Sequence, residues 1–279
     1  MNKPGIYRDI SVEEYERADA ARSTTLRLFD RSAAHARQSI LEPRAPTTAL
    51  DLGTGLHSAV LEPDRFEQEY VAVPKVDRRT KVGKEAWARF IEEHPDQERL
   101  PQEDYDKCLK VRDALAIHST AHELLSGQGF NEVSVMWRER TTGMMCKARL
   151  DRLTLYSGYP CIMDLKSARD ASIWGFGKAI ADYELHFQAA MYLDGLDTLS
   201  PQPRRFVFLV IEAFPPWAIG TYELRNEALE LGRNDYLRAL QLFKNARDTN
   251  VWPGYREGLR EIDVPPWKYR KDSEYGDSF

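Results

Sequence analysis

The stretch "CIMDLKSA", residues 161–168, places two charged residues, Asp164 and Lys166, inside an apolar run. In a strand, alternate side chains share a face, so Asp164 and Lys166 point the same way and Leu165 points the other way. A structural ion pair is one interpretation, but pairing alone is a poor reason to bury two charges. The pattern therefore raises the hypothesis that the two charges serve chemistry.

This run is the last of three consecutive segments with strand periodicity. The other two are "NEVSVMWRE", residues 131–139, and "MCKARLDRLTLY", residues 145–156. Turn signals containing glycine separate the three segments, at 142–143 and 157–158, so we expect an antiparallel meander. Asp151 precedes Asp164 by 13 residues, a spacing that suits neighbouring positions on adjacent strands joined by a short turn.

Two carboxylates side by side repel each other, and a divalent cation removes the conflict. Asp151 and Asp164 are therefore candidate metal ligands, with the backbone carbonyl of Leu165 as a further oxygen. Lys166 then fits as the group that holds a water or steadies a phosphate oxygen. Metal-assisted hydrolysis of a phosphodiester needs this combination of carboxylates and a nearby positive charge.

Asp151 followed by Asp164-Leu165-Lys166 resembles the signature of the PD-(D/E)XK nuclease superfamily. Gly53-x-x-x-His57, on a helix expected over 48–61, looks like the RecB-type motif that presents a histidine to the metal. The resemblance implies that His57 is a metal ligand or acts through a metal-bound water. We expect Gly53 to allow close packing beside it, although a histidine on a helix is more often an ordinary core or surface residue.

Two further matches follow the same order along the chain. Glu132 opens the first strand, where this superfamily often has an extra acid, although a solvent-facing strand residue is an equal alternative. Gln188-x-x-x-Tyr192 is similar to the Q-x-x-x-Y motif of RecB-like nucleases. These two side chains lie one helical turn apart, and we expect them to contact DNA or to brace Lys166, rather than only to fill a core.

The sequence around these motifs, notably "QAAMYLDGL", resembles that of the exonuclease VIII group found in phages and prophages. That resemblance implies a restriction-endonuclease-like α/β fold, with a mixed central sheet flanked by helices, and a Mg²⁺ cofactor that Mn²⁺ can replace. It implies digestion of one strand of linear duplex DNA from its ends, 5′ to 3′, leaving 3′ single-stranded tails. It also implies a single-strand annealing protein as partner and a ring of three or four subunits.

Basic residues mark two candidate DNA contacts. The segment "KVDRRTKVGK", residues 75–84, holds five basic residues and one acid and is expected to be a loop. Its Arg78, Arg79 and Lys81 are proposed to track phosphates, although most such runs are solvated surface. Lys147 and Arg149 add positive charge near the expected metal strands.

The rest of the chain reads as one domain, 1–279, with no linker that divides it. We expect a helical portion over about 1–125, a catalytic sheet core over about 130–225, and a C-terminal helix and tail over about 226–279. Within the first portion, the capping-box spacing of Ser11 and Glu14 predicts a helix start, and another helix is expected near Ser23. Segment 66–74 is expected to be a strand, and 84–94 and 102–125 to be helices. Further on, we expect a helix over 185–196, a strand over 204–213 that pairs with 217–224, and a helix over 226–247.

Composition narrows the functional classes. The net charge of −5 argues against indiscriminate coating of nucleic acid, but it allows a local basic channel. No apolar stretch is long enough to cross a bilayer and no signal-peptide core is present, so we expect a cytoplasmic protein. The resemblance to the exonuclease VIII group implies that its cell is a bacterial host. The three cysteines are far apart and form no C-x-x-C pair, so neither a zinc site nor an iron–sulfur cluster is indicated.

Three competing functions stay open at this point. The chain could be an endonuclease, or a CRISPR-associated RecB-like nuclease, although the latter usually carries a cysteine-ligated iron–sulfur cluster. It could also be an inert module that binds DNA ends. The complete set of Asp151, Asp164 and Lys166 favours an active enzyme over the inert module.

Overall fold

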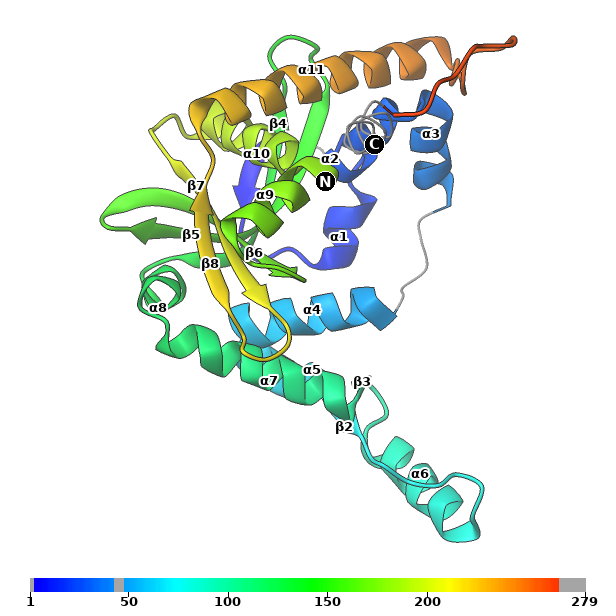
Figure 1. The fold of residues 1–279 in the computed structure, drawn as a ribbon, viewed down its shortest axis with the longest axis vertical. Coiled ribbons are helices and arrows are strands. Elements are labelled where there is room, and N and C mark those ends of the chain that lie inside the picture. The colour runs from blue at the N-terminus through cyan, green and yellow to red at the C-terminus, as the bar shows by residue number, and fades with distance from the viewer. Residues whose placement is uncertain (1–2, 43–47, 266–279) are drawn as a thin grey trace, which may run out of the picture.

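A computed structural model describes residues 3–42 and 48–265, with side chains from residue 52 onward in the second range. Its centre is a six-stranded sheet in the order β1-β4-β5-β6-β7-β8 (Figure 1). The β6–β7 pair is parallel and every other neighbouring pair is antiparallel. The strands are β1 (Gly5–Tyr7), β4 (Phe130–Arg138), β5 (Met145–Tyr156), β6 (Tyr159–Ala168), β7 (Arg205–Glu212) and β8 (Ile219–Glu223).

The expected meander of three strands is confirmed as β4, β5 and β6. Gly143 and Gly158 lie in the two turns with φ of 69° and 78°, in the left-handed region that glycine adopts without a Cβ clash. The expected fold class is also confirmed, since helices flank a mixed sheet on both faces. The β7–β8 pairing is confirmed as well.

One face of the sheet is covered by the second half of the chain and by part of the N-terminal region. Val135, Ile162 and Phe208 point into this core and meet Phe187 and Leu240 from the helices above. Aromatic and branched side chains at alternate strand positions make this face continuously apolar, which drives the helices onto it. The covering helices are α2 (Ser23–Leu26), η1 (Arg27–Asp30), α3 (Ala33–Leu41), α9 (Ile173–Asp182), α10 (Leu185–Leu199) and α11 (Asn226–Thr249).

The opposite face packs against the first half of the chain. Met163, Leu165 and Leu209 form its floor, and Leu56 and Leu115 come from the helices that cover it. These helices are α4 (Thr48–Leu61), α5 (Pro63–Glu69), α7 (Gln102–Ile117) and α8 (Ser119–Ser126). The sheet therefore lies between two helical layers, and side chains from both layers contact it around β4, β5 and β6.

An arm projects from the second helical layer (Figure 1). It consists of β2 (Tyr70–Val73) and β3 (Glu98–Pro101), which pair in parallel, and of α6 (Lys81–Glu93) at its tip. Trp87, Phe90 and His94 pack their rings against one another along α6. The arm holds the basic segment 75–84 at the point furthest from the sheet.

The N-terminal helix α1 (Val12–Arg17) begins as its sequence predicts. Ser11 Oγ accepts the Glu14 amide at 3.1 Å, and the Glu14 carboxylate accepts the Ser11 amide at 3.2 Å. Each half of the capping box satisfies an amide that the helix leaves unpaired.

Several element boundaries differ from the expectation. The segment 66–74 is helical through Glu69 before β2 begins, and the expected loop 75–84 becomes helical at Lys81. The expected helix 102–125 is broken at His118, whose backbone is extended and whose ring caps α8 at the Ala121 amide. The helix from Ser23 ends after one turn, and α9 was not predicted. No helix within 3–42 or 48–265 has the length and apolar character needed to span a membrane.

Candidate metal centre

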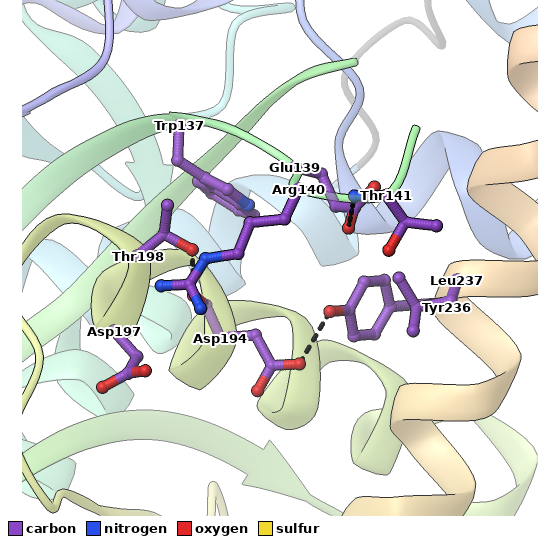
Figure 2. A pocket seen from close by; sticks show the side chains of 9 residues that line it. All are labelled: Trp137, Glu139, Arg140, Thr141, Asp194, Asp197, Thr198, Tyr236 and Leu237. Carbon is purple, nitrogen blue, oxygen red and sulfur yellow. Dashed lines mark hydrogen bonds between the residues drawn. The ribbon is translucent and has the colours of Figure 1, made fainter. Parts of the chain in front are cut away.

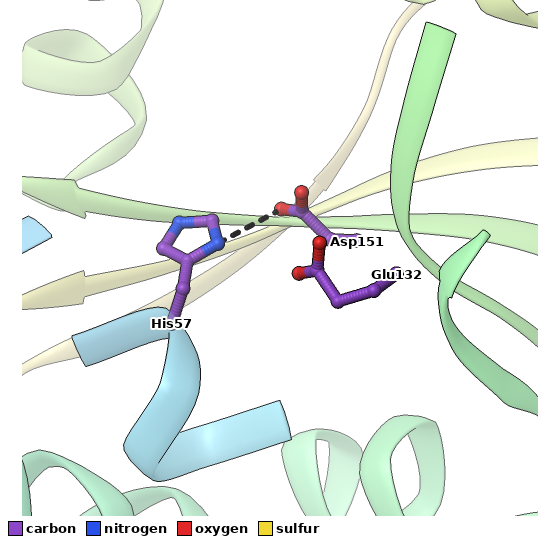
Figure 3. A group of neighbouring side chains, drawn as sticks. All are labelled: His57, Glu132 and Asp151. Carbon is purple, nitrogen blue, oxygen red and sulfur yellow. Dashed lines mark ion pairs between the residues drawn. The ribbon is translucent and has the colours of Figure 1, made fainter. Parts of the chain in front are cut away.

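Three side chains from three elements converge at the middle of the sheet (Figure 3). His57 of α4, Glu132 of β4 and Asp151 of β5 each offer one ligand atom, and these atoms all lie within 4.8 Å of one another. His57 Nδ1 is 3.7 Å from Asp151 Oδ2. The three side chains keep 32%, 22% and 15% exposure, so the cluster can be reached from solvent.

A kink in two neighbouring strands creates this convergence. Glu132 has a φ of 51°, in the left-handed region that costs strain for a residue with a Cβ. Val133 belongs to the core beneath α10, whereas Asn131 donates to a carbonyl at the end of α4, on the other face. The partner strand changes face at the same level, because Leu150 joins that core and Arg152 donates to a carbonyl of α8. Glu132 and Asp151 therefore sit where the regular alternation of the sheet is interrupted.

Arg149 holds Glu132 in this conformation. Its Nε donates to Glu132 Oε2 at 2.7 Å, and its Nη1 donates to Ser134 Oγ at 3.2 Å and to the Ile10 carbonyl at 3.3 Å. Arg149 was expected to be a candidate DNA contact; in this fold Glu132, Ser134 and the Ile10 carbonyl engage its guanidinium, and contact with DNA stays a prediction. The bracing role of Arg149 and Ser134 was not predicted, because it depends on the folded register of β4 against β5.

Asp164 is neighbour to this cluster but is held differently. Its side chain is 2% exposed, Oδ1 accepts from Gln188 Nε2 at 2.8 Å, and Oδ2 contacts the Lys166 ammonium. Gln188 therefore holds Asp164, whereas the sequence led us to expect that it contacts DNA or braces Lys166; its contact with DNA stays a prediction. Asp164 lies outside the group of three, and its role as a metal ligand stays a prediction.

The peptide of Leu165 joins the two parts of the site. Its amide donates to Asp151 Oδ2 at 2.7 Å, which fixes that carboxylate beside β6. The Leu165 carbonyl as a metal ligand stays a prediction.

The surroundings of the two carboxylates in the cluster disfavour their charged forms. Burial, together with repulsion from Asp164, raises the pKa of Asp151 to about 7. Burial and repulsion from Asp151 also raise the pKa of Glu132, against the opposing effect of Arg149. A cation bound between the two carboxylates would remove their mutual repulsion and offset the cost of burying their charges.

The two basic side chains beside these carboxylates, His57 and Lys166, favour opposite protonation states. Burial and the Lys166 charge lower the pKa of His57, which favours the neutral imidazole that can bind a metal. Burial alone would lower the pKa of Lys166, but Asp164 and Asp151 outweigh it, so the pKa is raised and the side chain stays an ammonium. Burial raises the pKa of Tyr192, whose hydroxyl shares a hydrogen bond with Ser23 and lies in the field of Asp164 and Lys166.

This donor set fits a divalent cation. Two carboxylates supply the oxygen ligands that Mg²⁺ and Mn²⁺ prefer, and one imidazole adds a nitrogen that Mn²⁺ also accepts. Gly53 was expected to allow close packing near His57, but among the described residues a Cβ there would meet nothing within 4 Å. The close approach is made by Gly55, whose Cβ would lie 3.1 Å from Leu100 and 3.4 Å from the Cys108 sulfur.

Lys147 does not reach DNA in this fold. Its side chain is buried, and its ammonium donates to the carbonyls of Tyr15, Glu16 and Ala18 at 2.8, 3.0 and 3.0 Å. These bonds use all three donors and fasten the end of α1 onto β5. The structure therefore gives no support to the expectation that Lys147 contacts DNA, because its ammonium is buried and backbone carbonyls take up its three donors.

The three basic residues of the arm are placed differently. Arg79 is 91% exposed and pairs with Asp77 at 3.0 Å, while Arg78 lies over the Trp87 ring at 4.3 Å. Lys81 is exposed at the first turn of α6. All three are accessible, and their contact with DNA stays a prediction.

A second acidic cleft lies between β4, α10 and α11, with a volume of about 290 Å³ (Figure 2). Glu139 accepts from the Thr141 amide at 2.7 Å and from the Thr142 amide and hydroxyl at 2.6 and 2.7 Å. Asp194 accepts two bonds from Arg233 at 2.7 Å and one from Tyr236 at 2.6 Å. The protein itself supplies the donors here, so this cleft has no need of a cation.

Comparison with known proteins shows the family to which the chain belongs. A family profile described as "PDDEXK-like domain of unknown function (DUF3799)" matches residues 23–263. The chain belongs to this PDDEXK-like family. The resemblance drawn from Asp151, Asp164 and Lys166 is thereby confirmed at the level of the superfamily. No curated protein matches the chain.

Solved structures with similar folds include one named "Putative exonuclease" from Eubacterium rectale. It shares 12% identity and a TM-score of 0.62, over 96% of this chain and 99% of that one, which shows a shared fold for the PDDEXK-like chain. Protein VC1899 from Vibrio cholerae matches at 14% identity over 87% of this chain and 62% of that one, with a TM-score of 0.23 too low to carry an argument.

Proposed function

We propose that this PDDEXK-like protein is a divalent-metal-dependent nuclease that hydrolyses phosphodiester bonds of DNA. The observation that carries the proposal is the convergence of His57, Glu132 and Asp151 within 4.8 Å, beside the ammonium of Lys166. The raised pKa values of Asp151 and Glu132 support it, because such strain is retained where it serves a site.

Each residue of the site has a distinct task. His57, Glu132 and Asp151 would hold the cation, which supplies Lewis acidity toward the phosphate and the attacking water. Lys166 remains charged and faces the same space, so it stabilises negative charge that develops on the phosphate oxygens. Asp164, steadied by Gln188, orients Lys166 through their ion pair.

We further propose linear duplex DNA as substrate, digested from its ends in the 5′-to-3′ direction with Mg²⁺. The motif similarity to the exonuclease VIII group supports this, and the similar fold of the "Putative exonuclease" agrees with it. The same resemblance supports a ring of three or four subunits and a single-strand annealing partner in phage-type recombination. An acidic protomer would dissociate often at physiological salt, and a ring that encircles the duplex would keep it engaged.

The test compares linear and covalently closed circular duplexes, each labelled and incubated with Mg²⁺. We expect loss of the linear form only, with label released first from the 5′-labelled end. The matched control is Asp151→Asn, which removes one carboxylate charge at nearly constant volume and should abolish the loss.

Two other functions give different results in this assay. Cleavage of both forms would indicate an endonuclease, and binding without cleavage by the unaltered protein would indicate an inert end-binding module. A cluster-dependent RecB-like nuclease is disfavoured, because Cys108, Cys146 and Cys161 are each buried, free and on different elements.

A further inference from the structure

The helix α9 exposes large apolar side chains. Trp174 is 87% exposed and Ile173 is 70% exposed at its start, and Tyr183, which follows its last residue, is 67% exposed. Tryptophan and tyrosine normally bury most of their large surface, so two exposed rings on one short helix need an explanation. The rings are nine residues apart, or ~13 Å along the helix at 1.5 Å per residue.

A cleft of about 810 Å³ runs along this helix. It lies between η1, the end of β6, α9 and the start of α10, which are adjacent in the fold (Figure 1). Tyr183 lines it directly, and Trp174 lies next to the lining residue Gly175 and one turn before the lining residue Lys178. The aromatic rings therefore stand at its edge.

The cleft borders the residues next to the metal centre. Lys166 and Gln188, which hold Asp164 at the candidate centre, are also part of its wall. A strand whose phosphate lies at Lys166 would thus pass along α9 on that side.

The wall carries more positive than negative charge. Its basic residues are Arg27, Lys166, Arg169 and Lys178, and its acids are Asp170 and Asp182. Asp170 Oδ1 already accepts the Ser172 amide at 2.9 Å. Arg27 is fixed in place by donating to the Tyr183 carbonyl, so one cation and one exposed ring are held together.

We propose that this cleft binds unpaired nucleotides of the substrate strand, with bases stacked on Trp174 and Tyr183 and phosphates paired with the surrounding cations. This rests on the proposed nuclease function. Cations that track a backbone beside exposed aromatic rings are the features by which proteins bind single strands without reading sequence. A protein partner or a second copy would leave unexplained why the basic cleft leads to Lys166.

The experiment measures binding of a fluorescein-labelled single-stranded oligonucleotide by anisotropy, in EDTA so that nothing is cleaved. Trp174→Ala should weaken binding by about 5- to 150-fold, the factor that stacking of one base typically contributes. Trp174→Phe should retain most of the affinity because it keeps a ring. Tyr159→Ala is the matched control, because Tyr159 is 65% exposed at the opposite end of β6.

A direct readout of stacking uses 2-aminopurine in the same oligonucleotide. We expect its fluorescence to be quenched on the unaltered protein and to recover with Trp174→Ala. Unchanged affinity and quenching in Trp174→Ala, while the unaltered protein still digests DNA, would overturn this inference and leave the nuclease proposal standing. A protein that binds single strands through Trp174 but cleaves nothing would overturn the nuclease proposal alone.

The oligomeric state decides the remaining case. Sedimentation of Trp174→Ala should match that of the unaltered protein. A shift to a smaller species would show that α9 packs against a second copy of the chain, and would overturn the assignment to nucleic acid.

Discussion

Two acidic clusters on the same strand system have opposite electrostatics. At the metal centre, Asp151 is held at a raised pKa of about 7 by burial and by Asp164. In the cleft beside α11, burial also works against Glu139, but the amides and hydroxyls of Thr141 and Thr142 outweigh it and lower its pKa. A cluster of carboxylates is therefore informative only when its hydrogen-bond donors are counted. Glu139 is stabilised by its own turn, whereas the pKa of Asp151 and that of Glu132 stay raised although the Leu165 amide and Arg149 donate to them.

The largest effect should come from the charge that faces the metal centre. We predict that Lys166→Ala lowers the single-turnover rate of DNA cleavage by about 10²–10⁴-fold, as for other positioned electrostatic groups. Mn²⁺ and DNA binding should be retained, because Lys166 is not a ligand and its removal relieves repulsion. Cleavage at a near-normal rate would return Asp164 and Lys166 to a structural ion pair.

The contrast between the two acidic clusters can be tested by matched substitutions. Glu132→Gln should weaken Mn²⁺ binding, measured by calorimetry, by about 10–100-fold, because a neutral amide cannot offset the cation. Glu139→Gln should leave Mn²⁺ affinity unchanged and lower the melting temperature instead, since it disturbs only the turn at Thr141 and Thr142. Equal loss of metal affinity in both variants would contradict the distinction.

The raised pKa of Asp151 predicts a pH dependence of metal binding. A group with a pKa of about 7 is largely protonated at pH 6, and a protonated carboxyl must release its proton before it can bind a cation. Mn²⁺ affinity should therefore fall by about fivefold between pH 7 and pH 6 and be flat above pH 8. The measurement is a calorimetric series at constant ionic strength, and a flat profile down to pH 5 would show that Asp151 titrates at its ordinary value.

The smallest effect concerns the arm. Neutralising Arg78, Arg79 and Lys81 together should weaken DNA binding and reduce the slope of log affinity against log salt by ~2.7, at 0.9 for each lost phosphate contact. The single-turnover rate at saturating DNA should change little, because the arm tip lies far from the metal centre (Figure 1). An unchanged slope would make the segment an ordinary solvated surface.

The sequence alone predicted the meander and the order of the motifs. Alternation in 131–168 and two glycine turns were enough to pair Asp151 with the strand of Asp164, and a local capping pattern was enough to start α1. The left-handed backbone of Glu132 could not be predicted, because it depends on Arg149 of the neighbouring strand β5, which holds the Glu132 carboxylate.

The sequence pattern also could not predict which basic residues stay accessible. Lys147 and Arg149 look like surface cations in the sequence, yet carbonyls of the N-terminal segment, more than a hundred residues earlier, accept hydrogen bonds from them. Arg79 carries the same charge but lies on the arm, where it forms an ion pair with Asp77. Tertiary contacts, and not composition, decide which cations remain available for a ligand.

The central claim is that His57, Glu132 and Asp151 form a divalent metal site required for cleavage. Its most direct test is Mn²⁺ calorimetry and DNA digestion on the unaltered protein and on Asp151→Asn, with Asp194→Asn as a control from the other acidic cleft. The account predicts that Asp151→Asn loses both Mn²⁺ binding and digestion, while Asp194→Asn keeps Mn²⁺ binding. Full Mn²⁺ binding and digestion by Asp151→Asn would contradict the metal site and, with it, the proposed function.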